Sequence, residues 1–160
     1  MNNPSIPAGF HSVTPYFAVE DASGAIAFYE KAFGAVERYR LPGMDGKGVG
    51  HAEITIGNSI LMLSDEFPEY GARSARSVGG SPVRFAIYVP DVDAAFQRAI
   101  DAGCKVVRAV EDMFYGDRAG CVEDPFGLSW TLMTHIKDVS PEEMKSHMAA
   151  QLAEGAATPN

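Results

Sequence analysis

The stretch DPFGLSWTL, residues 124–132, decides the fold of this chain. Pro125 fixes its own φ and Gly127 readily accepts a positive φ, so Asp-Pro-Phe-Gly predicts a tight turn. After the turn the side chains alternate in character: Trp130 and Leu132 share one side, while Ser129, Thr131 and Met133 share the other. This period of two predicts a strand over residues 128–133 that has one apolar face and one mixed face.

The chain repeats one pattern of predicted elements. Residues 17–21 (FAVED) match residues 87–91 (IYVPD) at an offset of 91 − 21 = 70. Each copy predicts a strand and then a capped helix that ends at a glycine. In the first copy the strand is 13–19 and the helix is 24–33, with Asp21 or Ser23 as its cap and Gly34 at its end. In the second copy the strand is 82–89, and the helix runs from its cap Asp91 to residue 102 and ends at Gly103. Three strands follow each helix, at 36–41, 48–56 and 59–64, and at 105–110, 118–122 and 128–133. The sequence therefore predicts an α+β fold of two tandem βαβββ modules, about residues 10–66 and 82–136, that form a cup-shaped mixed sheet.

Two segments lie outside these modules. Residues 65–81 are polar and unpatterned, which indicates a linker between the modules or a lid. The sequence SPEE at 140–143 has a helix cap, a proline at the first helical position and two acids, so a C-terminal helix and tail over 140–160 follow a domain over 1–139. An apolar stripe on that helix (Met144, Met148 and Leu152) suits an adaptable contact. We expect a C2 homodimer with this helix on the partner or over the module junction; the alternative is a monomer with the helix folded back.

Composition excludes several classes of partner. The net charge of −8 and pI of about 4.9 argue against nucleic-acid binding, which needs clustered Lys and Arg. The sequence predicts no membrane segment and no signal peptide. Cys104 and Cys121 have no metal-binding spacing and are expected to be small buried side chains of a cytoplasmic protein.

The duplicated βαβββ pattern, the aspartate caps and the Asp124-Pro-Phe-Gly127 turn resemble the vicinal-oxygen-chelate superfamily, which includes glyoxalases, bleomycin-resistance proteins and extradiol dioxygenases. The resemblance covers about residues 10–135. The sequences DMFYGDR at 112–118 and HAE at 51–53, and THI at 134–136 running to SPEE, are similar to the PhnB-like branch.

The resemblance implies a cup-shaped site in which each module supplies two metal ligands, a His or Gln from its first strand and a Glu from its last. The corresponding positions here are Thr14, Met62, Arg84 and Thr131. None is a good ligand for a metal of this kind, and Arg84 would place a fixed positive charge beside it. We therefore expect the family metal site to be lost and no cofactor to be needed.

The alternation of the strands predicts which side chains the cup collects: Thr14, Tyr16, His51, Glu53, Met62, Arg84, Tyr88, Ser129, Thr131 and Met133. An aromatic loop with Phe114, Tyr115 and Arg118 is expected near its mouth, and His11, His135 and His147 are expected outside it as surface histidines. Arg84 could bind a carboxylate or phosphate in bidentate fashion, or pair with Glu53 or another acid of the cup. His51 and Glu53, two residues apart, could be a general base with its orienting carboxylate, two ligands of a displaced divalent metal, or a structural polar pair.

The predicted function is that of a PhnB-like glyoxalase/bleomycin-resistance protein that binds a small molecule, an anionic one among the options, in the cup. Two alternatives stay open. One is a metal-dependent lyase, isomerase or dioxygenase with a displaced metal at His51 and Glu53. The other is a drug-sequestration protein, which binds its ligand and leaves it unchanged.

Overall fold

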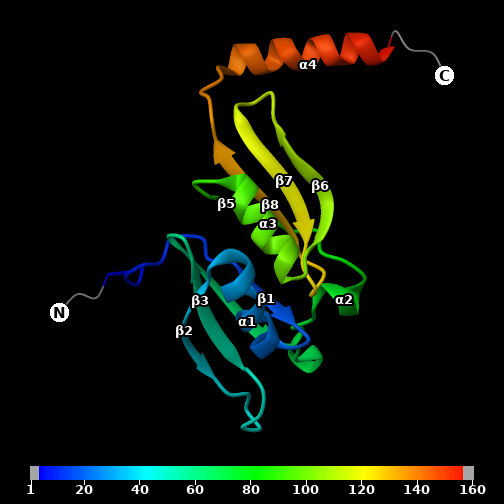
Figure 1. The fold of residues 1–160 in the computed structure, drawn as a ribbon. Helices are drawn as coiled ribbons and strands as arrows, with labels where there is room; N and C mark the ends of the chain where they lie inside the picture. The colour runs from blue at the N-terminus through cyan, green and yellow to red at the C-terminus, as the bar shows by residue number, and fades with distance from the viewer. Residues whose placement is uncertain (1–3, 157–160) are drawn as a thin grey trace.

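The computed structural model describes residues 4–156 and contains two βαβββ modules in tandem (Figure 1). The first consists of β1 (Tyr16–Val19), α1 (Ala22–Phe33), β2 (Val36–Leu41), β3 (His51–Ile56) and β4 (Ser59–Asp65). The second consists of β5 (Arg84–Tyr88), α3 (Val92–Ala102), β6 (Lys105–Asp112), β7 (Asp117–Glu123) and β8 (Ser129–His135). A 3-10 turn (Pro68–Tyr70) and the short helix α2 (Ala75–Val78) connect the modules, and α4 (Pro141–Ala156) follows them.

Each module builds one four-stranded mixed sheet. The strand orders are β1-β4-β3-β2 and β5-β8-β7-β6, with the first strand of each module parallel to its last. This confirms the predicted α+β class and the tandem modules. In the part of the chain that the structure describes, β1 and β5 are edge strands of separate sheets, and they approach each other through the rings of Phe17 and Phe85, whose centroids are 5.4 Å apart.

The predicted helix caps form as expected. The side chain of Asp21 accepts a hydrogen bond from the backbone N of Gly24 at 2.9 Å, and Asp91 caps α3 in the same way through Ala94 at 3.0 Å. Gly34 ends α1 with a φ of 68°, a left-handed conformation that a side chain would disfavour. Aspartate, not Ser23, is therefore the cap of both helices.

Some strands are shorter than predicted. Strand β1 begins at Tyr16 because Pro15 has no N–H to give the ladder; its carbonyl accepts from the N of Met62 at 2.9 Å. Strand β3 begins at His51. Gly48 has a φ of 56°, which is outside the extended range, and the backbone N of Val49 donates to the side chain of Asp65 at 2.6 Å.

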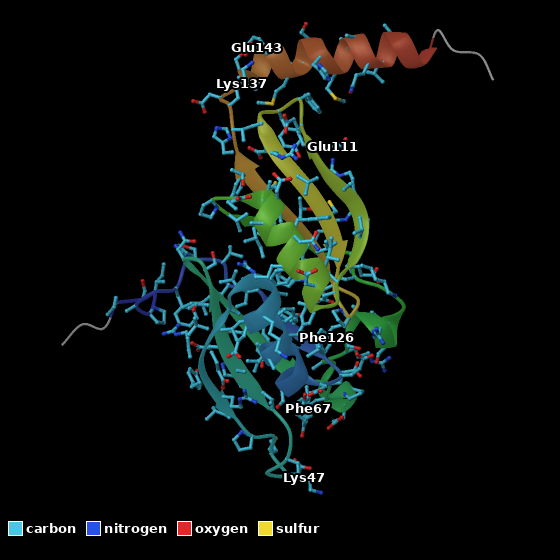
Figure 2. The ribbon with its side chains drawn as sticks, in the orientation of Figure 1. Lys47, Phe67, Glu111, Phe126, Lys137 and Glu143 are labelled. Carbon is cyan, nitrogen blue, oxygen red and sulfur yellow. The ribbon has the colours of Figure 1, made fainter. Side chains whose placement is uncertain are left out.

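Helices α1 and α3 cover one face of the two sheets and contact each other near the middle of the molecule (Figure 1). An aromatic cluster forms where α1 crosses to the second module. Tyr29 and Phe33 of α1 lie 5.4 and 4.6 Å from Trp130, and Phe28 lies 5.9 Å from Phe126, measured between ring centroids. Figure 2 labels Phe126 at this junction. The core therefore continues from one module into the other.

The turn after β7 has the predicted shape. Gly127 has a φ of +81°, and its N donates to the carbonyl of Asp124 at 3.1 Å. The side chain of Asp124 also accepts from the backbone N of Phe126 (2.8 Å) and of Leu128 (2.9 Å). The aspartate thus closes the turn with its own side chain, as Asx turns do.

Helix α4 stands apart from the modules and crosses beyond the tip of the β6–β7 hairpin (Figure 1). His147 on this helix stacks on Phe114 of the hairpin, with ring centroids 4.9 Å apart and planes inclined by 10°. Met148 and Leu152 are 45% and 69% exposed. The apolar stripe is therefore largely uncovered within this chain, while residues 157–160 of the predicted tail lie outside the described residues. Within residues 4–156, no helix has the length and apolar character that crossing a membrane requires.

Candidate functional site

The open face of the first sheet, which the helices do not cover, carries a buried carboxylate. Glu53 on β3 is 5% exposed. Its Oε1 accepts from the hydroxyl of Tyr39 at 2.7 Å, and its Oε2 lies 3.0 Å from Nη1 of Arg38. His51 contributes Nε2 at 3.7 Å from Oε1, and its Nδ1 is 3.3 Å from the hydroxyl of Tyr16. The buried negative charge is thus compensated by one guanidinium and by phenol and imidazole groups, as burial demands.

A β-bulge explains why two successive residues of β2 reach the same carboxylate. The register between β2 and β3 shifts between Glu37 and Tyr39, so that Arg38 and Tyr39 both lie within reach of Glu53. The hydrogen bond to this carboxylate raises the pKa of the Tyr39 hydroxyl, because the carboxylate favours the protonated phenol. Sequence analysis missed Arg38 and Tyr39, since a bulge leaves no clear trace in the residue pattern.

Three of the predicted cup residues form one row across this face. Tyr16 pairs with Met62 of β4, and Met62 pairs with Glu53. The alternation therefore placed these side chains together. Thr14 precedes β1 and lies instead beside a cavity between the modules, where Tyr88 also contributes to the wall.

The open face of the second sheet carries a second buried carboxylate, Asp117 on β7, which is 4% exposed. Its Oδ2 accepts from the hydroxyl of Tyr88 at 2.9 Å, and its Oδ1 lies 2.8 Å from Nδ1 of His135. The Nε2 of His135 lies 2.9 Å from Oδ1 of Asp138. The hydrogen bond to Asp117, followed by that to Asp138, raises the pKa of His135, because both carboxylates favour the imidazolium.

His135 is exposed, as predicted for a surface histidine. His135 shares the open face with Tyr88 through Asp117. The alternation contained the signal, because residue 135 has the same parity as Ser129, Thr131 and Met133 once β8 is extended to its observed end.

The thiol of Cys121 lies in the middle of the second open face. Cys121 Sγ lies 3.3 Å from the hydroxyl of Thr131 and 3.8 Å from Nη2 of Arg108. Cys121 is half-buried, unlike the predicted small core side chain. Cys104 does lie in the core, and burial raises the pKa of its thiol to about 12. Arg108 is the counterpart of Arg38, since each arginine lies at a register shift in its strand pair.

Arg84 opens β5 beside Ser129 of β8 and is exposed. The other arginines of the strands have polar or ionic partners: Arg38 with Glu53, Arg40 with Glu37, Arg108 with Glu111, and Arg118 with Asp93 and Asp112. The Arg84 guanidinium has no hydrogen-bonded or ionic partner within residues 4–156. The partner of Glu53 is thus Arg38 and not Arg84.

The predicted aromatic loop does not act as one group with the open face. Arg118 lies on the helix-facing side of β7, where its Nε and Nη2 each lie 2.8 Å from Asp93 of α3. The alternation along β7 causes this, because Arg118 has the opposite parity to Asp117. Phe114 packs on α4, and the ring of Tyr115 meets Phe114 edge-on with centroids 5.4 Å apart.

The residues present do not fit a divalent metal at His51 and Glu53. Both oxygens of Glu53 already have partners, and one of these is the cationic Arg38, so a metal would have to displace it. Over the described range 4–156, no cluster of three or more His, Cys, Asp or Glu side chains is arranged to hold a metal ion. The four positions that correspond to family ligands are the poor ligands Thr14, Met62, Arg84 and Thr131.

Two βαβββ modules, each with a sheet that helices cover on one face and that is open and polar on the other, define the glyoxalase-fold class. The family model for the Glyoxalase/Bleomycin resistance protein/Dioxygenase superfamily matches residues 9–132, and the chain belongs to this superfamily. An uncharacterized protein of Mycobacterium bovis is 46% identical over 143 residues, which cover 88% of this chain and 93% of that protein.

Solved structures show the same fold. TioX from Micromonospora has a TM-score of 0.62 and 22% identity, over 81% of this chain and 100% of TioX. A PhnB protein from Bacillus cereus has a TM-score of 0.59 and 16% identity, over 78% of this chain and 99% of that chain. These identities support likeness of fold alone.

Proposed function

We propose that this protein binds a small molecule with an anionic group on the open face of its second sheet. In this proposal it is a PhnB-like glyoxalase/bleomycin-resistance protein that acts in the cytoplasm and has lost the family metal. Arg84 carries this proposal, because it is the strand arginine without a partner in residues 4–156. An exposed guanidinium fork suits bidentate contact with a carboxylate or phosphate. Ser129 and Thr131 of the neighbouring strand supply hydroxyls on the same face.

A ligand screen tests this proposal. Small carboxylates, phosphates, phosphonates and sulfonates are screened by thermal shift, and hits are measured by calorimetry. We expect Arg84→Met to weaken binding of an anionic hit at least roughly tenfold, since hydrogen bonds to charged groups contribute about 1.5–3 kcal/mol. Lys47→Met is the control, because it removes the same charge at the far tip of the β2–β3 connection (Figure 2). Equal affinity of both variants and the wild type would show that Arg84 is not the anchor.

A second candidate function is acid–base catalysis at the first sheet. Its supporting observation is the chain of contacts from Tyr16 through His51 to the buried Glu53, which is the arrangement in which a carboxylate orients an imidazole. Turnover assays of the ligands found above would test it. Loss of turnover in His51→Gln with retained ligand binding is the expected result; unchanged turnover in that variant would exclude His51 as the base.

We also propose that the protein is a C2 homodimer. Large side chains remain exposed on both open faces, with Tyr16 at 56% and Tyr88 at 63%, and α4 exposes Leu152 at 69%. Such surfaces suit burial against a second copy. Sedimentation of the full chain and of a chain that ends after Val139 tests this. A full-length monomer at micromolar concentration would contradict the dimer, while a dimer that survives truncation would remove only the role of α4.

A further inference from the structure

A cavity of about 570 Å³ lies between the two modules, apart from the open face that carries Arg84. Its wall comes from the segment before β1, the β3–β4 turn, strand β5 and helix α3. This volume is in the range of about 300–1,000 Å³ that small-molecule sites occupy. Tyr88 borders both the cavity and the open face. Arg84, Ser129 and Thr131 do not contribute to the wall, so the anion site proposed above lies outside the cavity.

One side of the cavity is aromatic and apolar. Trp130 stacks on Phe85 with ring centroids 4.5 Å apart, and Phe33 lies 4.6 Å from the same indole. Ile56 and Ile87 add aliphatic surface to the wall. Apolar surface that a ligand removes from water here contributes on the order of 25 cal/mol per Å², so the body of a ligand should be apolar.

The charge of the wall has the opposite sign to that of the chain. The chain has 21 acidic residues against 13 Lys and Arg, yet none of the described residues that line the cavity is Asp or Glu. The wall does include Arg98 and His11. Arg98 is held in place, since its Nε donates to the carbonyl of Ala32 at 3.0 Å, while its two terminal amino groups have no partner among residues 4–156.

We infer that this cavity binds a monocarboxylic acid with an apolar body, of the class of medium-chain fatty acids and arylalkanoic acids. The carboxylate pairs with the terminal amino groups of Arg98, and the apolar body lies against Phe85 and Ile87. Trp130 is buried directly behind Phe85, on which it stacks. Because Nε of Arg98 is already fixed, less side-chain freedom is lost when the ion pair forms.

Decanoate is the probe, and Trp130 is the reporter because it is the single tryptophan of the chain. Titration of the full-length protein should change Trp130 emission saturably, and decanol, which has no charge, should bind at least roughly tenfold more weakly. Arg98→Gln should reduce decanoate affinity to that of decanol. Arg76→Gln on α2 removes the same charge away from the cavity and should leave the affinity unchanged.

Three results would overturn the inference: no saturable change in emission, equal affinity of decanoate and decanol, or full decanoate affinity in a folded Arg98→Gln variant. The comparison of decanoate with decanol needs only the wild-type chain, so it decides the role of charge even when Arg98→Gln does not fold. Loss of decanoate binding in Arg84→Met alone would instead assign the ligand to the open face, and would contradict the separate site.

Discussion

Asp124 joins the two modules through one buried carboxylate, and its removal should lower the stability of the chain substantially. The residue is 3% exposed. Its Oδ2 accepts from the hydroxyl of Tyr29 at 2.9 Å and from Nε1 of Trp130 at 2.8 Å, while Oδ1 accepts from the backbone N of Phe126 and Leu128. Tyr29 belongs to the first module and the other donors to the second.

Asp124→Ala leaves four donors without this acceptor, three of them buried and the backbone N of Phe126 partly buried. An unsatisfied buried group costs about 1–3 kcal/mol, and the lower value for each donor gives a total of about 4 kcal/mol. The lower value is appropriate because burial of the carboxylate itself is unfavourable: desolvation raises the pKa of Asp124 despite its hydrogen bonds. For a chain of this size, about 2–4 °C per kcal/mol predicts a fall in Tm of roughly 8–16 °C.

Denaturant unfolding and thermal melting measure this loss. Asp124→Asn keeps one acceptor oxygen but turns an amide N–H₂ toward some of the donors, so it should fall between the wild type and Asp124→Ala. Tyr29→Phe removes only one donor and should cost about 1 kcal/mol. Asp101→Ala is the charge-matched control at an exposed site and should change stability by less than about 0.5 kcal/mol. A fall in Tm of under about 3 °C for Asp124→Ala would refute the reasoning.

Three further changes test other parts of the structure. Gly127→Val should cost about 1–3 kcal/mol, because Gly127 has a φ of +81°; unchanged denaturant stability would contradict the turn. Gly120→Ala should cost about 1–3 kcal/mol, because an added Cβ would meet the Phe96 ring at 2.7 Å, and an unchanged Tm would show that the ring yields freely. The pKa of His135, followed by NMR, should be above its ordinary value and should fall in Asp117→Asn. Because folding raises this pKa, the stabilisation by His135 is fully present below its unfolded pKa and is lost as the pH rises through its folded pKa. The difference in unfolding free energy between the wild type and His135→Gln should therefore shrink over that rise in pH. A constant difference would contradict the ion pairs.

Helix caps, turn glycines and strand alternation predicted the modules, because each of these signals involves only residues that are close together in the sequence. Asp21 and Asp91 cap helices within three residues, and Gly34 and Gly127 supply positive φ where they stand. Alternation likewise placed Tyr16, Glu53 and Met62 on one face. These features depend on chemistry within a few positions of the chain, so they can be inferred without knowledge of the tertiary structure.

The features that sequence analysis missed or placed incompletely depend on contacts between distant segments. Arg38 and Tyr39 reach Glu53 only because of a register shift between β2 and β3. Asp124 was predicted as a turn residue, but its bond to Tyr29 spans 95 positions. Arg118 was assigned to the loop near the cup, yet the ion pair with Asp93 places it on the helix side. Pairing between segments decides all three cases, and a single sequence does not contain that pairing.

The two open faces follow one physical plan, which explains why Arg84 has no ionic partner among the strand residues within 4–156. Each face buries one carboxylate, Glu53 or Asp117, and each carboxylate accepts from a tyrosine and lies beside a cationic or protonatable group. A buried carboxylate that lost such partners would cost several kcal/mol, so these contacts fix the side chains of the face before any ligand arrives.

Arg84 is outside both networks, and its charge is therefore not neutralised by either. A ligand anion that pairs with Arg84 breaks no existing ion pair, whereas one that pairs with Arg38 must separate it from Glu53. The same comparison predicts that Arg84→Met weakens anion binding with little loss of stability, while Arg38→Met lowers stability, because it leaves Glu53 buried without its cation.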